Sequence, residues 1–164
     1  MFEHLSNPEY LHVLLNPLPI YGLAAGLLGL VIAMISRVPA ARVTALAVIF
    51  VSTLAAWPVY HYGEAAYDRV LSMADSDGGK WLEEHQRRGE QLIYVFYAVA
   101  ALAALALGAE RFAPGAAVPL ALTTVLLSSA TLIAGGYIAT AGGRIRHREY
   151  RYVLPPEPSK EDER

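Results

Sequence analysis

The sequence contains no cysteine, and this absence excludes several kinds of site at once. Without a thiol the chain can form no disulfide, no cysteine-ligated iron–sulfur cluster and no covalent attachment to a c-type haem. A cysteine nucleophile is excluded for the same reason. Any redox cofactor must therefore be held by other side chains.

Charged side chains are missing from four long stretches. Asp, Glu, Lys and Arg make up 17% of the chain, and none of them occurs in residues 10–36, 43–63, 91–109 or 112–143. Because about 20 apolar residues are needed to cross a bilayer core of about 30 Å, each stretch is long enough for one transmembrane helix. The sequence predicts an integral membrane protein surrounded by lipid, with spans at about 18–36, 43–62, 91–109 and 117–141.

The connections between these spans predict how the helices are arranged. Spans one and two, and spans three and four, are joined by turns so short that their helices must be antiparallel neighbours. The fold class expected is therefore all-α, an integral membrane four-helix bundle with up-down-up-down topology in a domain of residues 1–154. Both termini and the long connection at 63–90 then lie on one side, and residues 155–164 form a flexible polar tail.

The long connection carries its own pattern. Residues 64–73 mix apolar and polar side chains in the manner of an amphipathic helix, so we expect a short helix along the membrane interface. A second helix is expected to begin near Lys80 and to run into span three. The first span carries glycines at 22, 26 and 29, a spacing that predicts close packing of another helix on one face.

Basic residues give two answers about orientation. Eight Lys or Arg residues lie near the spans on the side of the termini and three on the other side, which by simple counting places the termini in the cytoplasm. The first 17 residues, however, contain no Lys or Arg, so the basic region of a cleavable signal peptide is missing and the first span favours an external N-terminus. We expect both termini on the outer face.

The net charge of −2 argues against nucleic acid as a partner.

Four histidines lie on the same side of the predicted bundle, one near an end of each span. His12 precedes span one, His61 ends span two, His85 precedes span three and His147 follows span four. One imidazole per helix at a common depth could bind a metal ion or the iron of a haem, with His12, His85 and His147 as the favoured ligands. The alternative is that these rings occupy the interface only because they are amphipathic, with no cofactor at all.

Charged residues border the same level. Arg88, Arg144 and Arg146 could pair with the propionates of a haem, but arginines at helix ends also anchor proteins at the interface. Glu64 follows His61 and Pro58 closely, and could act as a counter-ion, a proton carrier or an N-cap. We expect Glu64 to matter more than the loop carboxylate Asp75.

Several strings together resemble a known family. His12-Val-Leu-Leu-Asn-Pro-Leu-Pro, Pro58-Val-Tyr-His-Tyr-Gly-Glu and Gly142-Gly-Arg-Ile-Arg-His-Arg-Glu are similar to the recurring motifs of uncharacterised four-helix bacterial membrane proteins akin to domain-of-unknown-function family 2231. The resemblance implies a bacterial inner membrane and respiratory electron transfer, because members occur with Rieske-type and cytochrome domains. Relatives often carry histidine where this chain has Pro17, so one potential ligand is lost unless His61 replaces it.

These observations favour a redox subunit over an enzyme. The sequence shows no nucleophile with an adjacent base, no phosphate-binding loop and no acidic pair, so catalysis by this chain alone is not expected. The favoured interpretation is a membrane subunit that binds b-type haem, or else a copper or zinc ion, and exchanges electrons with other membrane or redox subunits. The alternative is a structural or assembly subunit of a membrane complex without a cofactor of its own. A proton carrier is weaker, because the bilayer centre holds no ionisable residue.

Overall fold

A computed structural model describes residues 6–156, and every regular element in this range is a helix, with no strand. His4 and residues 157–164 of the expected tail lie outside the described part. The elements are α1 (Pro8–Leu15), the π-helical turn η2 (Leu18–Gly22), α2 (Leu23–Ser36), α3 (Pro39–Leu54), α4 (Ala56–Ser72), α5 (Ser76–Phe112), α6 (Pro114–Arg146) and the short 3₁₀ turn η3 (Arg148–Tyr150).

Four helical stretches are long and apolar enough to cross a membrane. They cover Pro8–Ser36, Pro39–Ser72, Ser76–Phe112 and Pro114–Arg146. This agrees with the four expected spans and supports a multi-pass membrane protein. Each stretch extends beyond its expected span, because polar turns of helix continue past the lipid-facing residues.

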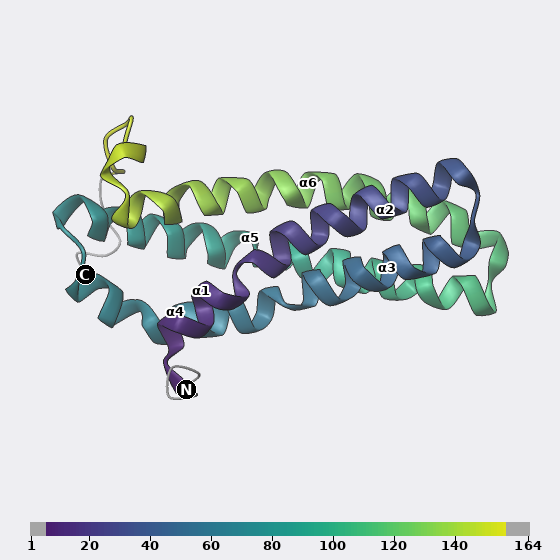
Figure 1. Cartoon of the computed structure of the whole chain (residues 1–164), viewed down its shortest axis with the longest axis horizontal. Coiled ribbons are helices and arrows are strands. Elements are labelled where there is room, and N and C mark those ends of the chain that lie inside the picture. The colour runs from purple at the N-terminus through teal and green to yellow at the C-terminus, as the bar shows by residue number, and fades with distance from the viewer. Residues whose placement is uncertain (1–5, 157–164) are drawn as a thin grey trace.

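The four stretches run alongside one another (Figure 1). The turns that join α2 to α3 and α5 to α6 lie at one end of the molecule, on the right in Figure 1. The turn that joins α4 to α5 lies at the other end, beside η3. Helix α5 packs against α6 and α3, α2 packs against α3, and α1 packs against α4. We call the end with the α4–α5 turn the terminal end.

Prolines divide the first two stretches. Pro17 and Pro19 have no N–H to donate, and the chain passes from α1 to α2 through the π-helical turn η2. In the second stretch Pro58 leaves the carbonyl of Leu54 without its usual helical partner four residues later, and α3 ends at Leu54. The first stretch is thus divided into α1, η2 and α2, and the second into α3 and α4, and residues of α1 and α4 line the candidate site.

The long connection differs from the expectation. Residues 64–72 are the last turns of α4 rather than a separate helix, so a distinct interfacial helix is not confirmed. Helix α5 begins at Ser76, four residues before the expected start, because Asp75 caps it: Gly78 N–H donates to Asp75 Oδ1 over 2.7 Å. Only a turn at residues 73–75 remains between the two helices.

The core lies between α2, α3, α5 and α6. Its larger side chains include Leu23, Leu46, Ile49 and Phe96, and alanines of α5 and α6 fill the rest. The glycine stripe of α2 packs against α3, where a β-carbon on Gly26 would lie 2.8 Å from Ile49 Cγ1. The core thus fixes α5 against α6 over most of their length, and the candidate site depends on that register.

Candidate cofactor site

A cavity of about 650 Å³ opens among α1, α4, α5 and α6 toward the terminal end. Its wall is mostly apolar, with Ile20, Val59, Ile93, Phe96 and Ile138 among the lining residues. Cofactor sites in proteins commonly have this size and an apolar lining with a few convergent polar groups. Here two of the polar groups are the imidazoles of His12 and His85.

His12 is fixed on the neighbouring helix α4. Its Nδ1 lies 2.8 Å from the carbonyl oxygen of Val59. The ring lies directly on Gly63, where a β-carbon would come within 2.9 Å of Nδ1. Only glycine at residue 63 therefore lets the imidazole reach that carbonyl.

His85 is fixed on α6 in the same way. Its Nδ1 lies 3.0 Å from the carbonyl oxygen of Ile138, and a β-carbon on Gly142 would lie 3.0 Å from Cε1 of the ring. In both cases the acceptor carbonyl and the glycine are four residues apart on one helix face. The two histidines thus have matching local surroundings on two different helices.

The carbonyl contacts define the tautomer of both rings. Because a carbonyl oxygen only accepts, each Nδ1 must carry the proton and donate it. Nε2 is then left with its lone pair, which is the form of imidazole that binds metals. A hydrogen bond from the other ring nitrogen to a carbonyl is also the usual way in which proteins orient a metal-binding histidine.

The two imidazoles are close to each other. The centroids of the His12 and His85 rings are 6.3 Å apart, and the ring planes are at 84°. A metal–imidazole bond of about 2.0 to 2.1 Å, with the ring centre roughly 1.1 Å behind the nitrogen, places the centres of two ligands on opposite sides of one metal about 6.3 Å apart. The observed separation of the ring centres equals this value.

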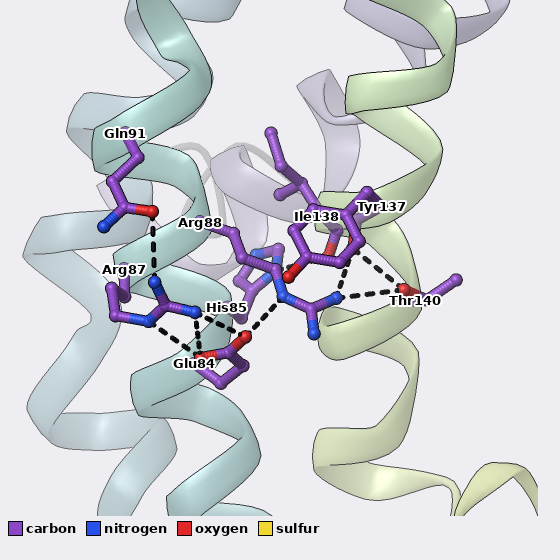
Figure 2. A network of polar contacts seen from close by, with 8 residues as sticks. All are labelled: Glu84, His85, Arg87, Arg88, Gln91, Tyr137, Ile138 and Thr140. Carbon is purple, nitrogen blue, oxygen red and sulfur yellow. Dashed lines mark hydrogen bonds and ion pairs between the residues drawn. The ribbon is translucent and has the colours of Figure 1, made fainter. Parts of the chain in front are cut away.

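A buried ion pair lies beside His85 at the contact of α5 with α6 (Figure 2). Arg88 Nε donates to Glu84 Oε1 over 2.7 Å, and both residues are nearly inaccessible, with 7% and 6% of their surface exposed. Arg88 Nη1 donates to the carbonyl oxygen of Tyr137 over 2.6 Å, and its guanidinium lies 3.7 Å from the centre of the Tyr137 ring. Arg87 binds Glu84 from the exposed side.

This network has a consequence for the role expected of Arg88. Its guanidinium is occupied by Glu84 and by α6, and Arg88 is not among the residues that line the cavity. The neighbouring carbonyls of Tyr137 and Ile138 bind Arg88 and His85 respectively. Arg88 therefore fixes the register of α5 on α6 at the height of His85, rather than offering a free charge to an anion.

The other expected arginines differ from each other. Arg144 lies over the ring of Trp81, 4.5 Å from its centre, and donates to the carbonyl of Tyr150, away from the cavity. Arg146 does line the cavity and is exposed. Among the described residues its polar contact is with Met73 Sδ at 3.6 Å, and no carboxylate pairs with it. Arg146 is thus the arginine available to an anionic group at the mouth.

The remaining expected histidines lie elsewhere. His147 is exposed, pairs with Glu149 at 3.0 Å and stacks on Tyr150. His61 is exposed and stacks on Trp57, on the outer side of α4. Within residues 6–156 no group of three or more His, Asp or Glu side chains is arranged to hold a metal ion. The structure brings together His12 and His85 only.

Glu64 lines the cavity and accepts a hydrogen bond from Tyr60 Oη over 2.8 Å. Asp75 lies outside the cavity, where it caps α5 and binds Arg148 and Arg151. The helix-capping role considered for Glu64 belongs to Asp75 instead.

Sequence reasoning missed the partners of the two histidines. The carbonyls belong to Val59 and Ile138, and the permissive glycines are Gly63 and Gly142. The available signal was a β-branched residue followed four positions later by glycine, a pattern that also occurs at Thr131 and Gly135. Such a pattern is too common to stand out until the histidines are seen to rest on it.

Comparisons with known proteins give no relative: no protein-family model matches the chain, and no curated protein or solved structure matches it. The family resemblance therefore stays a prediction.

Proposed function

We propose that the chain is a membrane-integral electron-transfer subunit in which His12 and His85 would hold one b-type haem. The observation that carries this proposal is the pair of imidazoles, each with Nδ1 on a helix carbonyl and with ring centres 6.3 Å apart. A haem iron held by two imidazoles supplies one-electron transfer between its ferric and ferrous forms.

The donor set fits haem better than a bare metal ion. A porphyrin supplies four nitrogens to its iron, so two imidazoles complete the coordination. Zinc and most copper sites need at least three protein ligands, and the described residues bring only two histidines together. Copper and zinc therefore remain secondary possibilities.

The surroundings also suit a large apolar cofactor with an anionic edge. The cavity is lined largely by aliphatic and aromatic side chains, and Gly89, one turn after His85, leaves open space where a side chain would project. Arg146 at the mouth is available to bind a propionate.

We further propose an up-down-up-down bundle in a bacterial inner membrane, with the termini and the cofactor site on the outer face. Partners would be other membrane or redox subunits. Fusing alkaline phosphatase to the C-terminus tests the orientation, since this enzyme is active only outside the cytoplasm. An inactive phosphatase fusion, together with fluorescence from a C-terminal fusion to green fluorescent protein, would reverse the assignment.

Absorption spectroscopy tests the cofactor. We expect the purified full chain in detergent to show a Soret band that shifts on reduction, with about one haem per chain. His12→Ala and His85→Ala should lose most of the haem, because an axial ligand supplies most of the affinity. His61→Ala and His147→Ala are the matched controls and should keep the spectrum, because both rings lie away from the cavity.

A second measurement separates ligand loss from misfolding. Added imidazole should restore a bis-imidazole spectrum in His85→Ala if the cavity is intact. A wild-type chain that contains neither haem nor stoichiometric metal, while all four variants accumulate normally, would contradict the proposal. The structural-subunit alternative would then hold.

A further inference from the structure

A second cavity lies on the flank of the molecule between α4 and α5. Its volume is about 390 Å³. Its wall is mainly aromatic, and two carboxylates reach it: the lining residues are Trp57, Tyr60, His61, Glu64, Glu90, Ile93, Tyr94 and Tyr97. Tyr60, Glu64 and Ile93 also line the larger cavity, so the two cavities share a wall.

Aromatic rings from both helices surround this cavity. The ring of Trp57 is nearly parallel to that of His61, with centres 6.0 Å apart and planes at 5°. On α5 the rings of Tyr94 and Tyr97 meet edge to face, 6.2 Å apart. Trp57 and Tyr94 are 61% and 70% exposed, so their ring faces remain accessible to a ligand.

The two carboxylates lack a cationic partner. Glu64 accepts from Tyr60 Oη, and Glu90 accepts from Gln86 Nε2 over 3.1 Å, but neither forms a salt bridge within the described residues. The basic side chain one turn before Glu90, Arg87, is held by Glu84 at 2.7 Å. Negative charge therefore lies uncompensated beside the aromatic rings.

We propose that this cavity binds an organic ammonium group. The faces of aromatic rings carry negative electrostatic potential and attract cations, and ammonium groups are commonly recognised by several rings around one site. Two carboxylates add direct attraction and would repel an anion. Among the described residues no three His, Asp or Glu side chains are arranged to hold a bare metal ion, whereas an ammonium group uses ring faces and carboxylates together.

Two sources carry this chemistry. The cavity lies where the charge-free part of α5 begins, so the headgroup of an amine-bearing lipid can reach it from the bilayer. A free amine can reach it from water. The proposal does not depend on haem, because none of its interactions involves His12 or His85.

Saturation-transfer NMR with choline tests the inference on the full chain in an uncharged maltoside detergent. We expect transfer to the trimethylammonium protons of choline and at least threefold less to 3,3-dimethyl-1-butanol, its uncharged isostere. The double variant Glu64→Gln/Glu90→Gln should lower the affinity for choline at least fivefold. Asp77→Asn, a carboxylate outside the cavity, is the matched control and should leave it unchanged.

The aromatic contribution is tested separately. Tyr94→Leu, which keeps bulk but removes the ring, should weaken choline binding by threefold or more. Equal binding of choline and its isostere would overturn the proposal, because the cavity would then be only an apolar groove. Unchanged choline binding in the double glutamine variant would overturn it as well.

Native mass spectrometry distinguishes the two sources. The chain is reconstituted in nanodiscs of phosphatidylglycerol with a minor fraction of phosphatidylethanolamine. Retention of phosphatidylethanolamine by the wild type, and its loss in the double variant, supports the inference with a lipid as the ligand. Choline or ethanolamine binding in solution without lipid retention supports it with a soluble amine. The absence of both forms of binding would overturn the inference.

Discussion

The ring of His85 rests on Gly142, so closely that a β-carbon at residue 142 would lie 3.0 Å from Cε1 and 3.1 Å from Nδ1. His12 rests on Gly63 with an even shorter distance of 2.9 Å to Nδ1. Two helices therefore approach a histidine of a neighbouring helix at a glycine. This contact gives both imidazoles access to a carbonyl, and it makes the glycines as important for the site as the histidines.

Alanine at either glycine is expected to displace the histidine above it. Gly63→Ala should have the larger effect, because the overlap is greater and the ring must move or leave the carbonyl of Val59. We expect the haem content of Gly63→Ala to fall at least threefold and that of Gly142→Ala to fall less, as measured by the pyridine haemochrome spectrum.

Gly136→Ala on α6 is the matched control. A β-carbon there meets nothing within 4 Å, and alanine favours a helix over glycine by about 1 kcal/mol, so this variant should keep its haem and unfold at the same or a higher temperature. Haem contents of Gly63→Ala and Gly142→Ala equal to that of Gly136→Ala would show that the glycines do not position the ligands.

The pair of Glu84 and Arg88 predicts an asymmetry between two substitutions. Glu84→Gln leaves the buried guanidinium of Arg88 without its counter-ion, a change that typically costs about 3–5 kcal/mol. Arg88→Met should cost less, because Arg87 still compensates Glu84 from the exposed side. Thermal unfolding of the purified variants in detergent, followed by circular dichroism, measures both costs.

The ion pair of Arg42 with Glu110 is the control for position. It joins α3 to α5 at the end opposite the cavity. Loss of this pair through Arg42→Met should lower the unfolding temperature without changing the absorption spectrum, whereas Arg88→Met should also alter the spectrum through His85. Identical spectra for Arg88→Met and wild type would limit Arg88 to a role in stability.

Sequence reasoning located the helices well because the signal was long and strong. Each apolar stretch of about 20 residues without charge has few other structures open to it. The break between α3 and α4 has a local cause, since Pro58 removes a helical hydrogen bond. The separate helix at 64–72 was not found, because amphipathic periodicity alone does not show whether a helix continues from the preceding one.

The site was predictable only in part. The histidines were visible by residue type, but depth along the chain does not show which way a ring points. His61 and His147 lie at suitable heights and face outward, while His12 lies before the first span and reaches inward because α1 packs on α4. Arg88 looked like a free cation because its partner Glu84 is one turn away on the same buried face, and burial is a tertiary property.

Asp75 holds the turn between α4 and α5 to the segment after α6. The guanidinium of Arg151 and the backbone N–H of Gly78 lower the pKa of Asp75 to about 2. Because the pKa is below its unfolded value near 4, the stabilisation from Asp75 is present above about pH 4 and is lost as the pH falls toward 2. We expect the carboxyl carbon resonance of Asp75 to titrate near pH 2 by NMR.

Asp75→Ala should loosen both segments at neutral pH, because alanine offers no oxygen to cap α5 or to bind the two arginines. Hydrogen exchange should speed up in residues 76–80, which lose the cap, and in residues 146–151, which lose the ion pairs of Arg148 and Arg151. Asp77→Ala in the first turn of α5 removes none of these contacts and is the control. Exchange that is equally slow in both variants would contradict this role of Asp75.

Arg146 offers a test of the cavity that leaves both ligands in place. Its charge lies at the mouth without a carboxylate partner among the described residues. If the proposed haem is bound, Arg146 should stabilise the reduced form, which carries one positive charge less than the oxidised form. Arg146→Gln should therefore lower the midpoint potential by roughly 30 mV, about a threefold change in the redox equilibrium. The shift should shrink at high salt, because the residue is exposed.

Arg148→Gln, whose guanidinium is bound to Asp75 and lies outside the cavity, is the matched control and should shift the potential much less. Potentiometric titration of the Soret band measures both variants, and equal potentials for Arg146→Gln and wild type would place the anionic edge of the haem away from Arg146.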